Sequence, residues 1–253
     1  MKIKNTSLLS GLSGKYGDFI ICQTKDGPIM KRKANYSASK RATDPRYARV
    51  RDNSANFATA GRAVKLVRAA FERPLKFAKD AKLTPRMQAV MMQVVKSDLI
   101  NGCGLRTAAN GDLSLLQGFE CNADANFALI GAGDYTVNID RILGRVTLNN
   151  PSIKPKSHLV HPDKATHFRI TCAVAEIDFN ENIRSTNDSA SGLLPLNSKP
   201  TGAIILTTAI NPGSTLPVFV AMGIQFVEMI NGKEFPFESR EFNPLCFVKI
   251  EKP

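Results

Sequence analysis

The strongest constraint on the fold is a series of short apolar β-type runs that fills the chain beyond residue 105. Eight such runs occur there, at residues 113–116, 135–139, 146–148, 167–174, 202–208, 216–223, 225–230 and 246–250. Turn signals, among them Asn110-Gly111 and Asn231-Gly232, separate many of them. Many short strands divided by turns favour an antiparallel sandwich. We therefore predict a β-sandwich domain over residues 105–253. The polar stretch at residues 180–199 is predicted to be a long surface loop.

The residues before 105 have a helical periodicity instead. Asp44 is suited to cap a helix and Pro45 to be its first residue. Small or apolar residues then recur every three or four positions, at Phe57, Ala60, Val64, Val67 and Phe71. We expect this helix to end or kink at Pro74.

A second helix is expected to begin at Thr84, with Pro85 in its first position. Its apolar stripe consists of Met87, Val90, Met91, Val94 and Val95. Gly102 and Gly104 are expected to close it.

The N-terminal 33 residues predict a β-hairpin. The run at residues 18–22 is β-rich, Lys25-Asp26-Gly27 is a turn signal, and Ile29 begins a return strand. A polar loop at residues 34–44 should connect the hairpin to the first helix. We thus expect a basic hairpin-plus-helices region over residues 1–104, followed by the sandwich.

Positive charge is concentrated in the first part of the chain. Residues 1–100 contain 21 Lys+Arg and 7 Asp+Glu, whereas residues 101–253 contain 13 and 15. A one-sided basic segment attracts phosphates, acidic lipids or acidic protein surfaces, including a surface of a second copy. The candidate partner or phosphate contacts are Lys31, Arg32, Lys33, Lys40, Arg41, Arg46, Arg49, Arg62 and Lys65.

Two interpretations of this basic region remain open. Tyr16, Tyr36 and Tyr47 lie near it and could stack on bases. However, the sequence contains no helix-turn-helix, zinc-finger or RNA-recognition signature. The same charges could instead form a solvated face or dock on an acidic neighbour.

No sequence motif supports an enzyme, a cofactor or a metal site. The chain has no Gly-x-Ser-x-Gly and no His-Glu-x-x-His. His158, His161 and His167 with Asp163 could bind zinc in principle, but Pro162 argues against a shared helical face. We expect Glu176 and Asp178, two apart, to lie on a solvated strand face.

The cysteines indicate a reducing compartment. Their number is odd and no CxxC pair occurs, so a disulfide framework is not expected. They are Cys22, Cys103, Cys121, Cys172 and Cys246. No apolar run is long enough for a transmembrane helix or a secretory signal. We therefore expect synthesis in the cytoplasm, which is compatible with later release or packaging into a particle.

Two stretches of the chain carry a family resemblance. The first is the stretch at residues 11–20, which contains Ser13-Gly14-Lys15-Tyr16-Gly17 and is followed by a hairpin and a basic segment. The second comprises residues 165–170 and the tail at residues 221–245. Together they resemble uncharacterised Bacteroidota proteins with an N-terminal Ser-Gly-Lys-x-Gly segment and an immunoglobulin-like β-domain. The resemblance implies an immunoglobulin-like form of the sandwich, and it implies no activity, ligand or catalytic residue.

These observations predict an α+β chain with an N-terminal β-hairpin, two helices and an antiparallel immunoglobulin-like β-sandwich. The charge asymmetry and the absence of catalytic motifs favour a non-enzymatic structural or interaction protein. We expect it to assemble into a homo-oligomer or a larger particle, such as a phage or secreted assembly, or to bind another protein. The alternatives are a nucleic-acid-binding protein that uses the basic region and a sandwich that carries a ligand on its loops.

Overall fold

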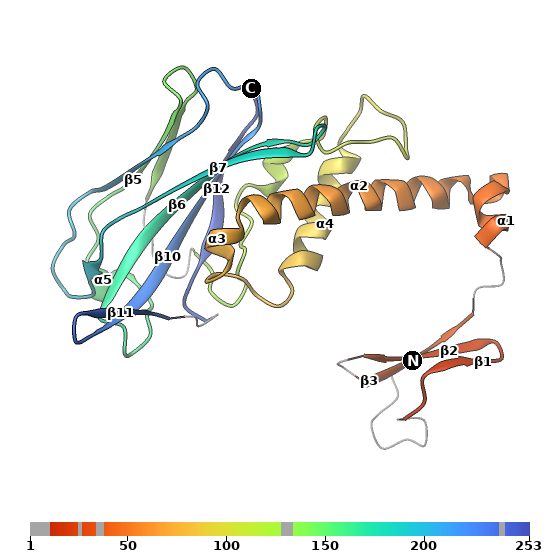
Figure 1. Cartoon of the computed structure of the whole chain (residues 1–253), viewed down its shortest axis with the longest axis horizontal. Coiled ribbons are helices and arrows are strands. Elements are labelled where there is room, and N and C mark those ends of the chain that lie inside the picture. The colour runs from red at the N-terminus through yellow and green to blue at the C-terminus, as the bar shows by residue number, and fades with distance from the viewer. Residues whose placement is uncertain (1–10, 25–26, 34–37, 128–133, 238–240) are drawn as a thin grey trace. The chain divides into compact units, whose positions relative to one another are not determined.

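The computed structural model describes residues 11–24, 27–33, 38–127, 134–237 and 241–253 (Figure 1). It consists of mixed helices and antiparallel sheets. The chain divides into two compact units, Met1–Arg51 and Asp52–Pro253. The boundary expected near residue 105 lies inside the second unit, because the helices there share a hydrophobic core with a sheet.

The first unit contains a three-stranded sheet in the order β1-β2-β3, so the expected hairpin is confirmed and a further strand is added to it. The strands are β1 (Gly14–Tyr16), β2 (Phe19–Thr24) and β3 (Gly27–Arg32). A short helix α1 (Ala38–Thr43) and a 3-10 turn η1 (Pro45–Tyr47) follow. The expected turn residues Lys25 and Asp26 and part of the loop expected at 34–44 lie outside the described residues.

Both predicted helices exist, but their starts differ from the expectation. They are α2 (Ala48–Ala70) and α4 (Leu83–Lys96), with the short α3 (Glu72–Leu75) between them. Asp44 caps η1 rather than α2, since its side chain accepts a hydrogen bond from the N–H of Arg46 at 3.0 Å.

The start of α4 is likewise not capped by Thr84, which lies inside the helix. Asp80 instead accepts a hydrogen bond from the N–H of Lys82 at 2.5 Å. Asp80 is available for this role because Arg86 and the N–H of Ala123 hold its carboxylate in place.

The second unit contains two antiparallel sheets. The long strands β6 (His167–Asp178) and β10 (Val218–Ile230) form the centre of the larger sheet. Around them pair β7 (Ile183–Ala190), β8 (Leu194–Pro195), β11 (Lys233–Pro236) and β12 (Leu245–Glu251). The smaller sheet has the order β4 (Thr136–Asp140), β5 (Arg145–Asn150) and β9 (Ile204–Ala209), and α5 (Pro155–His158) follows β5.

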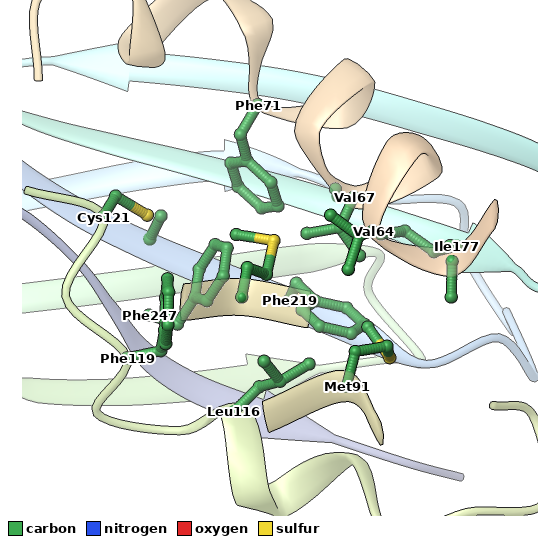
Figure 2. Close-up of a cluster of buried hydrophobic side chains, with 14 of the residues drawn as sticks. Val64, Val67, Phe71, Met91, Leu116, Phe119, Cys121, Ile177, Phe219 and Phe247 are labelled. Atoms are coloured by element: carbon green, nitrogen blue, oxygen red, sulfur yellow. The ribbon is translucent and has the colours of Figure 1, made fainter. Parts of the chain in front are cut away.

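The larger sheet is covered on both faces, which explains why β6 and β10 are almost continuously apolar. Alternate side chains such as Ile170 and Met222 share a hydrophobic core with Leu148 of the smaller sheet. The side chains between them face α2, α4 and the segment 113–121. Figure 2 shows this second interface, where Phe71 of the helical layer approaches Phe247 of β12.

Three segments differ from the predicted strands and loops. Residues 113–116 form a 3-10 helix, η2 (Leu113–Leu116), because Asp112 caps that turn. The expected loop at 180–199 contains β7 and β8, because β7 pairs with β6 through backbone bonds that need no apolar side chains. The two runs expected at 216–223 and 225–230 form one strand, β10, which begins at Val218 and continues through Ile224. The sheet order does not establish an immunoglobulin-like topology.

Candidate functional site

Seven of the nine predicted contact residues lie in the first unit, and all seven are exposed. They are Lys31 and Arg32 on β3, Lys33 after it, Lys40 and Arg41 on α1, Arg46 on η1 and Arg49 on α2. Arg46 forms an ion pair with Asp44 at 2.7 Å, and this carboxylate raises the pKa of the Arg46 guanidinium.

The first unit has very little hydrophobic core. Among its described residues, Ile21 and Pro28 are the two that are buried. Tyr16 and Phe19 are directly paired across β1 and β2, and they are 46 % and 44 % exposed. Because alternate residues of a strand share a face, Phe19 and Ile21 lie on the same face of the sheet. This face therefore presents two aromatic rings to solvent.

The other two predicted residues, Arg62 and Lys65, lie on α2 in the second unit and line a cleft of about 710 Å³. Arg106 and Arg184 line the same cleft. We call it the basic cleft. Its complete lining is Thr59, Arg62, Ala63, Lys65, Leu66, Ala69, residues 104–108, Phe179, Asn180, Asn182 and Arg184, and this set contains no Asp or Glu.

The loop that carries Arg106 is anchored by a buried carboxylate. Asp98 is fully buried and accepts hydrogen bonds from the N–H groups of Ile100, Asn101 and Thr107 at 2.8 to 3.1 Å. The Asn101 side chain donates another at 2.9 Å. These hydrogen bonds outweigh the effect of burial and hold the pKa of Asp98 well below its usual range.

The same loop is also attached directly to α2. The buried Asn56 accepts a hydrogen bond from the N–H of Gly104 at 3.1 Å. Gly104 has a φ of +91°, and a Cβ there would lie 2.8 Å from Oδ1 of Asp52. Glycine is therefore required at this close approach.

The turn between β6 and β7 forms the third wall of the basic cleft. Asp178 accepts hydrogen bonds from the N–H groups of Asn180 and Glu181 at 2.9 and 3.1 Å. Asn182 adopts a φ of +57°, a conformation that Asn tolerates better than most residues. This geometry turns the chain into β7, whose second residue, Arg184, lines the basic cleft.

The basic cleft contains four cations, Arg62, Lys65, Arg106 and Arg184. None of the four cations takes part in an ion pair within the part of the chain that the structure describes. Arg62 donates a hydrogen bond to the hydroxyl of Thr59, at 3.0 Å. Nε of Arg106 is buried and has no hydrogen-bond partner among the described residues. The cleft therefore presents four positive charges to any ligand that enters it.

Two of these four cations were predicted as contact residues from the sequence, and the other two were not. The dense cluster of basic residues in the first 100 positions identified Arg62 and Lys65. Arg106 follows the second helix, and Arg184 lies in the stretch that was expected to be a loop. Neither has a local motif, so only the tertiary contacts of α2 with the 104–108 loop and the β6–β7 turn bring them to the cleft.

The residues considered for metal or acid–base chemistry do not converge. Within the described ranges, no group of three His, Cys, Asp or Glu residues could hold a metal ion. Glu176 is buried rather than solvated, and its carboxylate accepts hydrogen bonds from the backbone and side chain of Asn211 at 2.9 and 2.8 Å. Asp178 accepts hydrogen bonds from backbone N–H groups of the β6–β7 turn. These contacts give both carboxylates structural roles.

Glu120 is a carboxylate with a shifted pKa that lies beside two cysteines, Cys121 and Cys246. Burial raises the pKa of Glu120 to about 7, and burial also raises the pKa of the nearby Cys246 thiol to about 12. The thiol of Cys121 is completely buried, and its pKa is likewise raised. At neutral pH both cysteines are therefore protonated and poorly nucleophilic.

The comparisons with known proteins give no family. No protein-family model, no curated protein and no solved structure matches the chain. Among the described residues, no helix is both long and apolar enough to cross a membrane.

Proposed function

We propose that this chain is a non-enzymatic structural or interaction protein that assembles into a homo-oligomer or a larger particle through its N-terminal unit. The observation that carries the proposal is the near-absence of a core in the β1-β2-β3 sheet, where Ile21 and Pro28 are the only buried residues among those described. Small sheets need a covered hydrophobic face for stability. A contact with another molecule would supply that cover.

The composition of the exposed surface favours a protein contact. Tyr16 and Phe19 form an exposed aromatic pair, and aromatic residues are enriched at protein interfaces. Strands β1 and β3 are the two edges of the sheet, and an edge strand can pair with a strand of another chain.

A second copy of the chain is the partner that the charges favour. The basic surplus lies entirely within residues 1–100, whereas residues 101–253 carry a small acidic surplus. The basic N-terminal unit of one copy can therefore be attracted to the remainder of another. Salt would weaken the contribution of the exposed charges to this contact. The contribution of the buried aromatic rings would persist at high salt.

Light scattering coupled to size-exclusion chromatography tests the proposal on the whole protein, at low and high salt. Phe19→Ser and Tyr16→Ser should each give a molar mass below that of the wild-type assembly, corresponding to a smaller oligomer or a monomer. Lys15→Ser is the matched control, because Lys15 lies on β1 beside Tyr16 but on the opposite face of the sheet. A monomeric wild-type protein, or two aromatic variants with unchanged mass, would refute the proposal.

Nucleic-acid binding by the basic N-terminal region is the second candidate. It is favoured by the three consecutive exposed cations Lys31, Arg32 and Lys33. Absorbance at 260 and 280 nm detects co-purified nucleic acid readily, since the chain has no Trp. The Glu replacements for this test are at Lys31, Arg32, Lys33, Arg41, Arg46 and Arg49, all exposed residues of the N-terminal unit, and together they should abolish binding. Unchanged binding would exclude this candidate.

The immunoglobulin-like class remains a proposal for the two sheets of the second unit. It is supported by two antiparallel sheets that share a core of alternating side chains. A particle component synthesised in the cytoplasm is the setting that we propose for the protein. An experimental structure of the assembled protein would test the sheet topology and the contacts of the N-terminal unit together.

A further inference from the structure

We propose that the basic cleft of the second unit binds a nucleoside phosphate, either as a free nucleotide or as a unit of single-stranded nucleic acid. This inference does not depend on assembly through the N-terminal unit. The cleft is formed by α2, the 104–108 loop and the β6–β7 turn, all of which belong to residues 52–253.

The first argument is the convergence of like charges. Arg62, Lys65, Arg106 and Arg184 come from three separate elements and line one cleft with no acidic residue. Like charges repel one another, so such a cluster disfavours the folded chain unless an anion offsets it. A ligand with two or more negative charges provides that offset.

The second argument is the type of donor. Guanidinium groups bind phosphate oxygens with two parallel hydrogen bonds, and three of the four cations are arginines. Nε of Arg106 is buried and has no hydrogen-bond partner among the described residues, so the hydrogen bonds within the described chain leave this donor unused. Further polar groups are supplied by the side chains of Thr59, Thr107, Asn180 and Asn182.

The third argument is that the walls are fixed before any ligand arrives. The four hydrogen bonds to Asp98 hold the loop on both sides of Arg106. Asn56 attaches the same loop to α2 through Gly104. A preorganised site loses less conformational freedom on binding, so its charges contribute more fully to affinity.

The size and lining of the cleft indicate what accompanies the phosphate. Its volume of about 710 Å³ lies within the range of small-molecule sites and exceeds what a phosphate ion needs. Ala63, Leu66 and Phe179 add apolar surface between the polar groups. This surface suits a sugar and base, whereas the cations suit the phosphates. A nucleoside phosphate combines the two chemistries.

The experiment measures binding by isothermal titration calorimetry on the full chain, with ATP, a twelve-residue oligothymidylate and inorganic phosphate as probes. We expect ATP or the oligonucleotide to bind at least tenfold more tightly than phosphate, with an affinity that falls as salt increases. Arg106→Gln should weaken that binding at least tenfold. Arg62→Gln, an exposed position on α2, provides a second cleft variant that does not disturb the loop.

Lys76→Gln is the matched control, because Lys76 is an exposed cation of the same unit and does not line the cleft. A second control replaces Lys31, Arg32 and Lys33 by Gln in the N-terminal unit. Melting temperatures confirm that each variant is folded, and light scattering records its oligomeric state. Loss of binding without a change of molar mass would separate the cleft from the proposed assembly.

The outcomes are distinct. Tighter binding of ATP than of the oligonucleotide assigns the cleft to a free nucleotide, and the reverse order assigns it to single-stranded nucleic acid. The proposal is overturned if neither probe binds more tightly than phosphate. It is also overturned if both cleft variants bind like the wild type, or if only the N-terminal replacements abolish binding.

Discussion

The helical layer and the larger sheet depend on each other through Phe247, and replacing it by Ala tests that dependence. Phe247 lies on β12 and is completely buried. Its ring centroid is 5.0 Å from that of Phe71, 6.2 Å from that of Phe119 and 6.0 Å from that of Phe219. These four rings join the chain after α2, the segment before β4 and two strands of the sheet (Figure 2).

The expected cost of Phe247→Ala is large. Buried Phe→Ala substitutions reduce the free energy of unfolding by about 3–5 kcal/mol. Because Phe247 contacts three other rings, and aromatic pairs contribute beyond their buried area, we expect a value of about 4–5 kcal/mol. For a unit of this length, that loss corresponds to a fall in melting temperature of roughly 10 °C or more.

Val248 provides the matched control on the same strand. It is buried, but it belongs to the core between the two sheets rather than to the one beneath the helices. Val248→Ala removes two methyl groups and should cost about 2 kcal/mol. Its effect should not reach the helices directly.

Urea unfolding followed by circular dichroism measures both losses, because the chain has no Trp to report by fluorescence. Amide hydrogen exchange in α2 and α4 supplies the specific readout. It should accelerate in Phe247→Ala more than in Val248→Ala. If Phe247→Ala cost no more than Val248→Ala and left exchange in the helices unchanged, the packing of the helices on this face would be refuted.

Two further predictions concern stability. Gly111→Ala should reduce the free energy of unfolding in urea by about 3 kcal/mol, because a Cβ there would lie 2.0 Å from the backbone oxygen of Val94. Gly102→Ala is the control and should be nearly neutral, because a Cβ at Gly102 would meet no atom within 4 Å. Equal effects of the two substitutions would contradict this prediction. The pKa of Glu120 is about 7 in the folded protein and about 4.3 in the unfolded chain, so folding favours the protonated carboxyl group. The contribution of this group to stability is therefore complete below about pH 4.3 and is lost as the pH rises through about 7. Glu120→Gln should flatten the fall in melting temperature between pH 5 and pH 8 while keeping an acceptor for the N–H of Phe127, and an unchanged pH profile would argue against this role.

Local patterns in the sequence predicted most of the helices and strands. The apolar stripe of the second helix is a property of spacing alone, and Met87, Met91 and Val94 are all fully buried in α4. The alternation and turn signals of the later residues predicted strands such as β5 and β9. These elements are predictable because their hydrophobic period is set by the geometry of a single element.

The errors arose where long-range contacts override local composition. Residues 183–190 are polar and mostly exposed, so they have the composition of a loop, yet they form β7 because the backbone of β6 lies beside them. Leu113 and Leu116 are apolar like strand residues, but they are buried as one face of a 3-10 turn against α4 and β12.

The sequence by itself determined the helical stripes, the N-terminal hairpin and the concentration of positive charge in the first 100 residues. The tertiary structure decided that the larger sheet is covered on both faces, and that Arg106 and Arg184 join Arg62 and Lys65 in one cleft. The physical reason is that periodicity and charge are encoded among near neighbours, whereas a layer or a cleft depends on contacts between residues far apart in the chain. Such contacts exist only after the core has brought those residues together.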